Sequence, residues 1–311
     1  MDPLDATGTE IDALQIALAS GEVVRIGPSV SLYHTRSRDS EMTAQVATVL
    51  EQFLDVAGER IRFGLFGRGH QSTMTRQEVL DWPDRLRDAP LEKAASITLH
   101  GGAGAMDAHP VYFSCLLPAA WSPRPGCYIS AGFSMEILST RKTSLAAWTR
   151  AACGVFDPDH GHGGFALATN LNWGNNDHVV GQLAAILERF PGLDFPAHPG
   201  TNHVYSDGPV AANWLTILSE PFLNKMGGRQ NIVQAIVDLE GQALEWDGGL
   251  ILVAPGLPQL GDSEAGLFPE GYRKVGRMIA ALRGAPDASY FNGATDRDMR
   301  TFAKIWRARF D

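Results

Sequence analysis

The sequence predicts an α+β fold in which antiparallel sheets are covered by helices. Three apolar stretches, 95–100, 110–117 and 127–138, follow one another with few helix signals between them, which is typical of an antiparallel meander. The segment 243–254 carries an Asp-Gly-Gly turn between two apolar halves, the pattern of a β-hairpin. Amphipathic segments with helical spacing lie among these candidate strands and supply the covering layer.

The first half of the chain is expected to begin with a short helix over 9–20, followed by a strand over 23–33. A helix over 41–57 comes next, because Asp39 can cap its start and Gly58 can end it in the left-handed conformation. The remaining elements of this half are a strand over 61–66, a helix over 76–86, the meander and a helix over 143–153.

The second half is expected to contain a strand over 165–171, the hairpin and several helices. The last helix is basic and amphipathic, and Phe302 and Trp306 on its apolar face would dock it against the body. The helices of this half are predicted over 178–190, 210–226, 230–238, 270–283 and 295–310.

Two of these helices resemble each other, which leaves the organisation of the chain open to two interpretations. Residues 45–53 and 182–190 follow a similar pattern of Leu, Ala, Glu and Phe. An internal duplication would give two similar lobes, 22–155 and 160–285, whereas a chance likeness is also expected between helices built from common helix formers. No long Ser/Gly linker interrupts the chain, so we predict a single domain over 1–311.

Composition and charge narrow the classes of function. The 311 residues are 44% hydrophobic and 20% charged, which is ordinary for a globular chain with a large core. The formal net charge is −9, whereas a nucleic-acid-binding protein needs a basic face for phosphates, so no direct contact with nucleic acid is expected. The charge is uneven, because residues 238–270 contain seven acidic residues and no Lys or Arg, while residues 272–311 carry a net charge of +5.

The sequence also favours a cytoplasmic protein. Its N-terminus is acidic and lacks the pattern of a secretory signal, and no apolar run is long enough to predict a membrane span. The three cysteines, Cys115, Cys127 and Cys153, form no CxxC pair, and their odd number makes no closed disulfide framework. Buried thiols in a reducing compartment are therefore expected.

Motifs for catalysis or cofactor binding are weak, and no cofactor is expected. Residues 100–104 (His-Gly-Gly-Ala-Gly) resemble the oxyanion loop of α/β-hydrolases, but no G-x-S-x-G elbow accompanies them, so we predict a turn between two strands. No phosphate-binding signature is present. The segment 157–162 (Asp-Pro-Asp-His-Gly-His) could hold a divalent ion, which leaves a metal-dependent hydrolase as the alternative to a solvated loop.

Five short motifs follow one another at 213–219, 227–228, 247–253, 260–262 and 269–275. In their order and spacing they resemble the TsiV-type family of type VI secretion immunity proteins, over about residues 30–285 and most strongly from residue 160. The resemblance implies a cytosolic, non-enzymatic antitoxin. Its partner would be a cognate effector, a nuclease toxin of the VRR-Nuc type, bound so that the active site is blocked.

Within this resemblance the motifs have scaffold roles, and none is catalytic. Trp214 and Leu218 would be anchors of a core helix, residues 227–228 a helix stop and residues 248–249 the hairpin turn. A structural component of the secretion machinery is a further possibility, and the oligomeric state is left open.

Acidic residues are the expected contacts with such a toxin, because a nuclease holds phosphates in a positively charged cleft. Trp173 and Trp246, in turns expected to be exposed, are candidate aromatic anchors. The alternative, that the acidic surface only keeps the protein soluble, stays open. The acidic candidates are Asp157, Asp159, Glu245, Asp247, Asp262 and Glu264.

Overall fold

Eleven strands in the described part of the chain form one antiparallel sheet, as the α+β prediction requires. The computed structural model describes residues 15–17, 23–67, 69–105, 107–123, 125–139, 144–168, 180–195, 208–209, 211–283 and 299–310. The strands are β1 (Gln15–Ala17), β2 (Val23–His34), β3 (Phe63–Phe66), β4 (Ser72–Thr73), β5 (Ala95–His100), β6 (Tyr112–Leu117), β7 (Cys127–Gly132), β8 (His160–Ala168), β9 (Leu215–Ser219), β10 (Gln242–Trp246) and β11 (Gly249–Val253). Their order is β10-β11-β9-β8-β2-β7-β6-β5-β3-β4, and β1 pairs with β2 outside this path.

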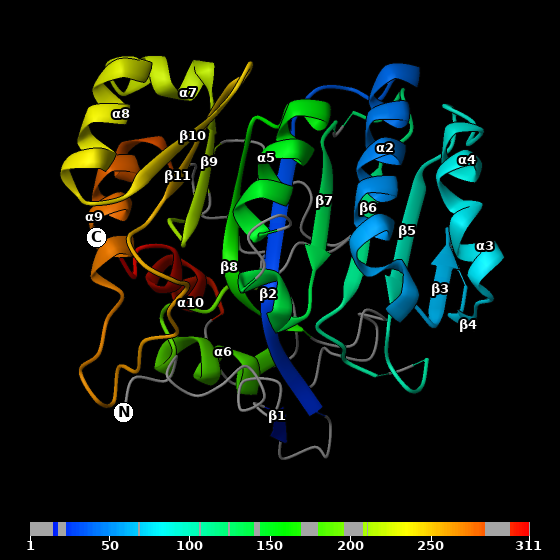
Figure 1. Cartoon of the computed structure of the whole chain (residues 1–311), viewed down its shortest axis with the longest axis horizontal. Helices are drawn as coiled ribbons and strands as arrows, with labels where there is room; N and C mark the ends of the chain where they lie inside the picture. Colours follow the sequence, from blue (N-terminus) through cyan, green and yellow to red (C-terminus); the bar gives the residue numbers. More distant parts are fainter. Residues whose placement is uncertain are drawn as a thin grey trace.

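Helices pack on this sheet along its whole width (Figure 1). In the figure, α2 and α5 cross in front of the central strands, while α7, α8 and α9 lie beside β9–β11. The helices are α2 (Ser40–Ala57), α3 (Arg76–Leu80), α4 (Trp82–Arg87), α5 (Leu145–Phe156), α6 (Val180–Arg189), α7 (Glu220–Lys225), α8 (Arg229–Asp238), α9 (Glu270–Ile279) and α10 (Met299–Arg307), with short 3-10 turns η1 (Gly58–Arg60), η2 (Met135–Leu138) and η5 (Ala280–Leu282).

The long strand β2 joins the two halves of the chain. Residues Arg25–Tyr33 pair with β8, the first strand of the second half, and residues Ser29–His34 pair with β7 on the other side. β8 in turn pairs with β9, so the meander and the C-terminal hairpin belong to one hydrogen-bonded sheet. The predicted meander (β5–β7) and hairpin (β10–β11) are both confirmed.

The two helices with similar sequences pack in different apolar clusters. α2 buries Val46, Leu50 and Phe53 in the larger cluster, which continues under α5 and across β9 and β11. α6 buries Leu183 and Leu187 in the smaller cluster beside the outer ends of β2 and β8. The internal duplication, and the lobes drawn from it, therefore stay a prediction.

The predicted helix over 210–226 is wrong, because residues Leu215–Ser219 form the buried strand β9 between β8 and β11. A short apolar run has the same pattern in a buried strand as in a buried helix, and only the pairing partners decide between them. Helix α7 starts after this strand, with Pro221 in its first turn. Trp214 and Leu218 are buried as expected. Leu218 lies in β9 and Trp214 directly precedes it, so neither residue anchors a helix.

Other element boundaries also differ from the predictions. Residues 15–17 of the predicted helix over 9–20 form β1, and β8 begins at His160 rather than at residue 165. α2 starts as predicted, with the Asp39 carboxylate accepting a hydrogen bond from the Met42 N–H at 2.7 Å. Gly58 has a φ of −60° and leads into η1, so the left-handed ending predicted there is wrong.

The three cysteines are buried free thiols, as predicted. Burial raises the pKa of Cys115 to about 12, and burial likewise raises the pKa of the other two thiols. No thiolate is therefore available for nucleophilic chemistry near neutral pH.

The last described helix, α10, docks through aromatic side chains, as its amphipathic sequence predicts. Phe302 and Trp306 are buried in the smaller cluster with α6. The Arg309 guanidinium lies 4.0 Å from the centre of the Trp306 ring and donates to the Pro191 carbonyl at 2.7 Å. The basic residue therefore covers the aromatic anchor and ties it to the segment after α6.

The docking of α10 predicts different effects for two adjacent substitutions. Trp306→Ala removes a side chain that is 2% exposed and is expected to lower the free energy of unfolding by about 3–5 kcal/mol. Ile305→Ala, at a position that is 59% exposed, should change it by less than about 0.5 kcal/mol. Urea unfolding followed by tryptophan fluorescence and circular dichroism measures both, and equal effects would contradict this docking.

Candidate functional site

The predicted acidic contact residues form two separate groups, one near each end of strand β8. Asp157 and Asp159 directly precede β8, beside the end of β10, which carries Glu245, and the β10–β11 turn, which carries Asp247. The other end of β8 lies near the segment 191–195, whose Gly192 N–H donates to the Leu260 carbonyl close to Asp262. The acid-only stretch of the sequence therefore does not form one continuous patch.

Near the hairpin turn, a single arginine neutralises much of the acidic charge. The Arg229 guanidinium lies 2.9 Å from the Glu220 carboxylate and 3.2 Å from that of Glu245. Asp247 is exposed in the turn, and its carbonyl accepts from Arg229 at 3.5 Å. Exposed pairs of this kind contribute little stability, so they mainly set the local charge of the surface.

The structure describes one of the two aromatic anchors proposed from the sequence, Trp246. Trp246 is only 7% exposed, so the expectation of an exposed aromatic in a turn is wrong at this position. Its indole packs in the core, and its Nε1–H donates to Asp157 Oδ1 at 3.1 Å. Asp157, which ends α5 in the left-handed conformation with φ 49°, is thus the partner that fixes Trp246. Trp173 lies outside the described residues.

Asp159 is an internal hydrogen-bond acceptor rather than a residue of a solvated loop. Its Oδ2 accepts from the Thr35 N–H and Thr35 hydroxyl, both at 2.6 Å, and lies 3.1 Å from His34 Nδ1. Burial alone raises the pKa of Asp159, but the hydrogen bonds from His34 and Thr35 outweigh it and hold the pKa well below its usual range. The carboxylate thereby pins the end of β2 to the start of β8.

The two histidines of the 157–162 segment are buried within β8, so the solvated-loop interpretation is wrong for them. Both rings contact Tyr33, with ring centres 5.1 Å away for His160 and 5.7 Å for His162. His162 Nε2 also lies 3.2 Å from Asp194 Oδ2, and burial lowers the pKa of this imidazole despite the opposing effect of Asp194.

This geometry gives the metal-dependent hydrolase no support. The two carboxylates of the segment are engaged by Trp246, Thr35 and His34, while His162 faces Asp194. In the part of the chain that the structure describes, no group of three or more His, Cys, Asp or Glu side chains could hold a metal ion. The sequence could not indicate His34 or Asp194 as partners, because both come from distant segments that the sheet brings together.

The glycine-rich segment after β5 is a closed turn, as predicted. The N–H groups of Ala103 and Gly104 donate to Asp107 Oδ2 at 2.8 and 2.9 Å. His100 pairs with Gln71, and burial lowers the pKa of its imidazole to about 4. The backbone donors that an oxyanion hole needs are thus taken by a carboxylate of the same loop.

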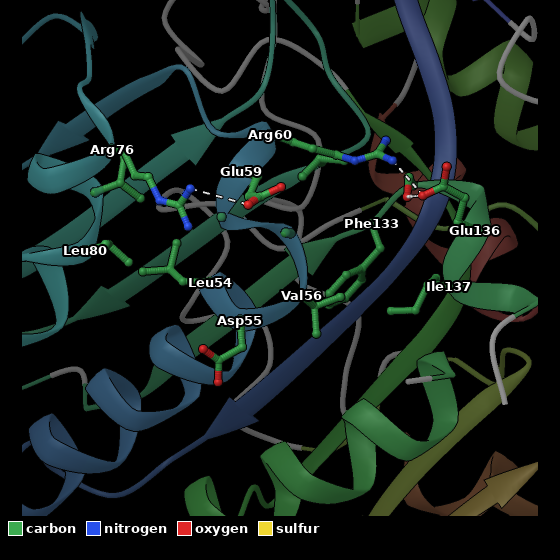
Figure 2. A pocket seen from close by; sticks show the side chains of 15 residues that line it. Leu54, Asp55, Val56, Glu59, Arg60, Arg76, Leu80, Phe133, Glu136 and Ile137 are labelled. Atoms are coloured by element: carbon green, nitrogen blue, oxygen red, sulfur yellow. Dashed lines mark hydrogen bonds and ion pairs between the residues drawn. The ribbon is translucent and has the colours of Figure 1, made fainter. Parts of the chain in front are cut away.

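A pocket of about 510 Å³ opens between the end of α2, η1, α3 and η2 (Figure 2). Apolar side chains, including Leu54 and Phe133, form its floor, and the charged rim holds two ion pairs, Arg60–Glu136 at 2.6 Å and Arg76–Glu59 at 3.4 Å. The Ser134 hydroxyl also lines the pocket and donates to Glu136 at 3.4 Å, but the Glu136 carboxylate is already paired with Arg60. Because the charged groups of the rim pair with one another, the geometry suits contact with another surface better than catalysis. Among the described residues, no helix is both long and apolar enough to cross a membrane.

The depressed pKa of Asp159 predicts how its contribution to stability changes with pH. Asp159→Asn should lower the free energy of unfolding by about 1–3 kcal/mol at pH 7, because charge-assisted hydrogen bonds are lost. Below about pH 4 this carboxylate becomes protonated in the unfolded chain before it does in the folded chain, so the wild type loses stability. The difference in unfolding free energy between the wild type and Asp159→Asn therefore narrows as the pH falls.

Urea unfolding of both proteins between pH 5 and pH 3 measures this gap. Asp247→Asn, in the exposed turn, is the matched control and should stay within about 0.5 kcal/mol of wild type. A gap that widens as the pH falls would show that Asp159 is not stabilised as a carboxylate.

Comparisons with known proteins identify one family and one solved structure with a similar fold. The model of the TsiV family, described as type VI immunity for VRR-NUC, matches residues 45–310. A solved structure titled "Pseudomonas aeruginosa T6SS protein PA0821" has the same fold, with a TM-score of 0.78, 14% sequence identity, and coverage of 99% of this chain and 91% of that chain. No curated protein matches. Since the family model spans most of the sequence, the chain belongs to the TsiV family of type VI immunity proteins.

Proposed function

We propose that this protein binds a cognate type VI secretion effector with a VRR-Nuc nuclease domain and neutralises it by occluding its active site. The observation that carries the proposal is the family match over residues 45–310, which includes the described strands from β3 onward and the described helices apart from the first residues of α2. A family defined by immunity to a nuclease implies a protein partner whose activity must be blocked.

The candidate catalytic groups named from the sequence are buried or engaged within the fold, which supports a non-enzymatic role. The thiols are buried, the candidate oxyanion donors are occupied, and the carboxylates before β8 are hydrogen-bonded to neighbours in the fold. A binding protein needs only a surface that fits its partner, so inhibition by occlusion requires none of these groups to react.

Electrostatics favour the same partner. A nuclease must hold phosphates in a cationic cleft, and this chain has a net charge of −9 with an acid-only stretch over 238–270. Several of these acids are paired with arginines, such as Glu245 with Arg229 and Asp262 with Arg189. Because these pairs reduce the local negative charge, binding to the nuclease must depend on the shape of the contact surface as well as on net charge. The expected place of action is the cytoplasm, where the nuclease meets DNA.

Co-expression with the effector of the adjacent open reading frame tests this proposal. Cells producing the effector alone should lose viability and show degraded chromosomal DNA, whereas cells that also produce this chain should keep both intact. A catalytically inactive effector controls for general toxicity, and an immunoblot of the soluble fraction confirms that the chain is present. Equal killing with and without soluble chain would refute the proposal for that pair.

A further inference from the structure

We infer that the loop over residues 254–269, between β11 and α9, is a preformed binding element that inserts into the cationic cleft of the nuclease effector. This inference rests on the proposed function and names the surface that carries it out. In Figure 1 the loop, drawn in orange, extends away from the sheet below α9. Its apolar and acidic side chains were not recognised from the sequence as one unit.

The base of the loop is anchored by buried groups. The Trp214 Nε1–H donates to the Gly256 carbonyl at 2.9 Å, and the Gln259 N–H donates to the hydroxyl of buried Tyr272 at 2.8 Å. The Leu260 side chain is buried in the smaller apolar cluster, and its carbonyl accepts from the Gly192 N–H at 2.7 Å. The path of the loop is therefore set by the body of the protein.

The tip of the loop is closed on itself. Asp262 and Leu267 exchange two backbone hydrogen bonds, each 2.8 Å long, and the Asp262 carboxylate accepts from the Glu264 N–H at 3.0 Å. Arg189 at the end of α6 lies 3.2 Å from Asp262 and 3.3 Å from Glu264. A loop held in this way loses little conformational freedom on binding, which is the property that makes preformed inhibitor loops effective.

Despite these anchors, the tip presents apolar side chains to solvent. Leu267 is 56% exposed, Phe268 is 40% exposed, and Leu257 at the other side of the loop is also exposed. Of the nine exposed large hydrophobic residues in the described chain, these three lie within twelve residues of sequence. Clustered apolar exposure on a fixed loop marks an interaction site, because scattered single residues are the normal case.

The charge around these side chains identifies the kind of partner. Asp262 and Glu264 lie in the loop and Glu270 directly follows it, while their arginine partners, Arg189 and Arg273, come from outside the loop. The Arg273 guanidinium also lies 5.4 Å from the centre of the Phe268 ring and leaves that side chain 40% exposed. Three acids against two arginines leave a small net negative charge around the exposed apolar side chains. Such a surface complements a site that offers both apolar contacts and cations. The phosphate-binding cleft of a nuclease supplies the cations of such a site.

Binding of full-length variants to the catalytically inactive effector tests the inference. The double variant Leu267→Ser and Phe268→Ser should weaken binding by about 100-fold, because a few central apolar contacts carry most of an interface. The controls Val237→Ser, at a 52% exposed position on α8, and Leu80→Ser, at the rim of the Figure 2 pocket, should change the affinity by less than about threefold. Unchanged thermal unfolding of each variant shows that the fold is retained.

A second pair of variants separates local complementarity from net charge. Glu264→Lys at the tip should weaken binding by about tenfold, whereas Asp238→Lys, which makes the same change in net charge at an exposed position of α8, should have little effect. Equal effects of the two would show that charge acts only at long range and would overturn the assignment of the tip.

The remaining outcomes are also decisive. If the wild-type chain binds and the double variant binds equally well, the loop is not the binding element, although the proposed function stands. Loss of binding in Leu80→Ser alone would place the partner on the pocket instead. If light scattering shows a wild-type dimer that the double variant dissociates without loss of effector binding, the loop joins two copies of this chain. Failure of the wild-type chain to bind refutes the proposed function and this inference together.

Discussion

The pairing of β2 with β8 is the contact on which the rest of the structure depends. Nine residues of β2 pair with β8 in register, and this seam joins the meander of the first half to the hairpin of the second. The close approach at the seam explains the glycines of β8, since a Cβ at Gly161 would lie 2.5 Å from the Ser31 carbonyl oxygen. Asp159 fixes the same seam at its end, through its hydrogen bonds to Thr35 and its contact with His34.

A continuous sheet of this kind makes a rigid scaffold from which loops can present a binding surface. The 254–269 loop follows β11, precedes α9 and is anchored by groups of the core, so contacts within this chain set its path. The similarity to the Pseudomonas aeruginosa structure, with a TM-score of 0.78 at 14% identity, shows that this fold tolerates extensive sequence change. A family that keeps its scaffold while its surface diverges can match different partners, because specificity resides in the surface contacts.

Local sequence signals predicted much of the fold. Asp39 as a helix cap, the Asp-Gly-Gly hairpin turn and the three strands of the meander depend on interactions between neighbouring residues, which a single sequence reveals. The strand β9 was predicted as a helix, because its five buried residues carry no periodicity that separates the two conformations. Its identity depends on β8 and β11, which are distant in sequence.

The candidate site was harder to predict for the same reason. Acidic residues could be counted, but the sequence could not show that Asp159 faces Thr35 or that Arg189 reaches Asp262 and Glu264. The sequence predicts an exposed turn at Trp246, whose ring is buried, because turn propensity does not indicate burial. The exposure of Leu267 and Phe268 likewise depends on how the loop is anchored, so the apolar tip emerged only from the structure.

The central claim is that this chain acts by stoichiometric binding and performs no reaction. Titrating it into a fixed amount of purified effector, with DNA cleavage as the readout, tests that claim most directly. We expect activity to fall linearly and to reach zero at a fixed, whole-number ratio of chain to effector, and full nuclease activity to return when the complex is dissociated. Complete inactivation by a small fraction of an equivalent, or effector that stays inactive after separation, would contradict it.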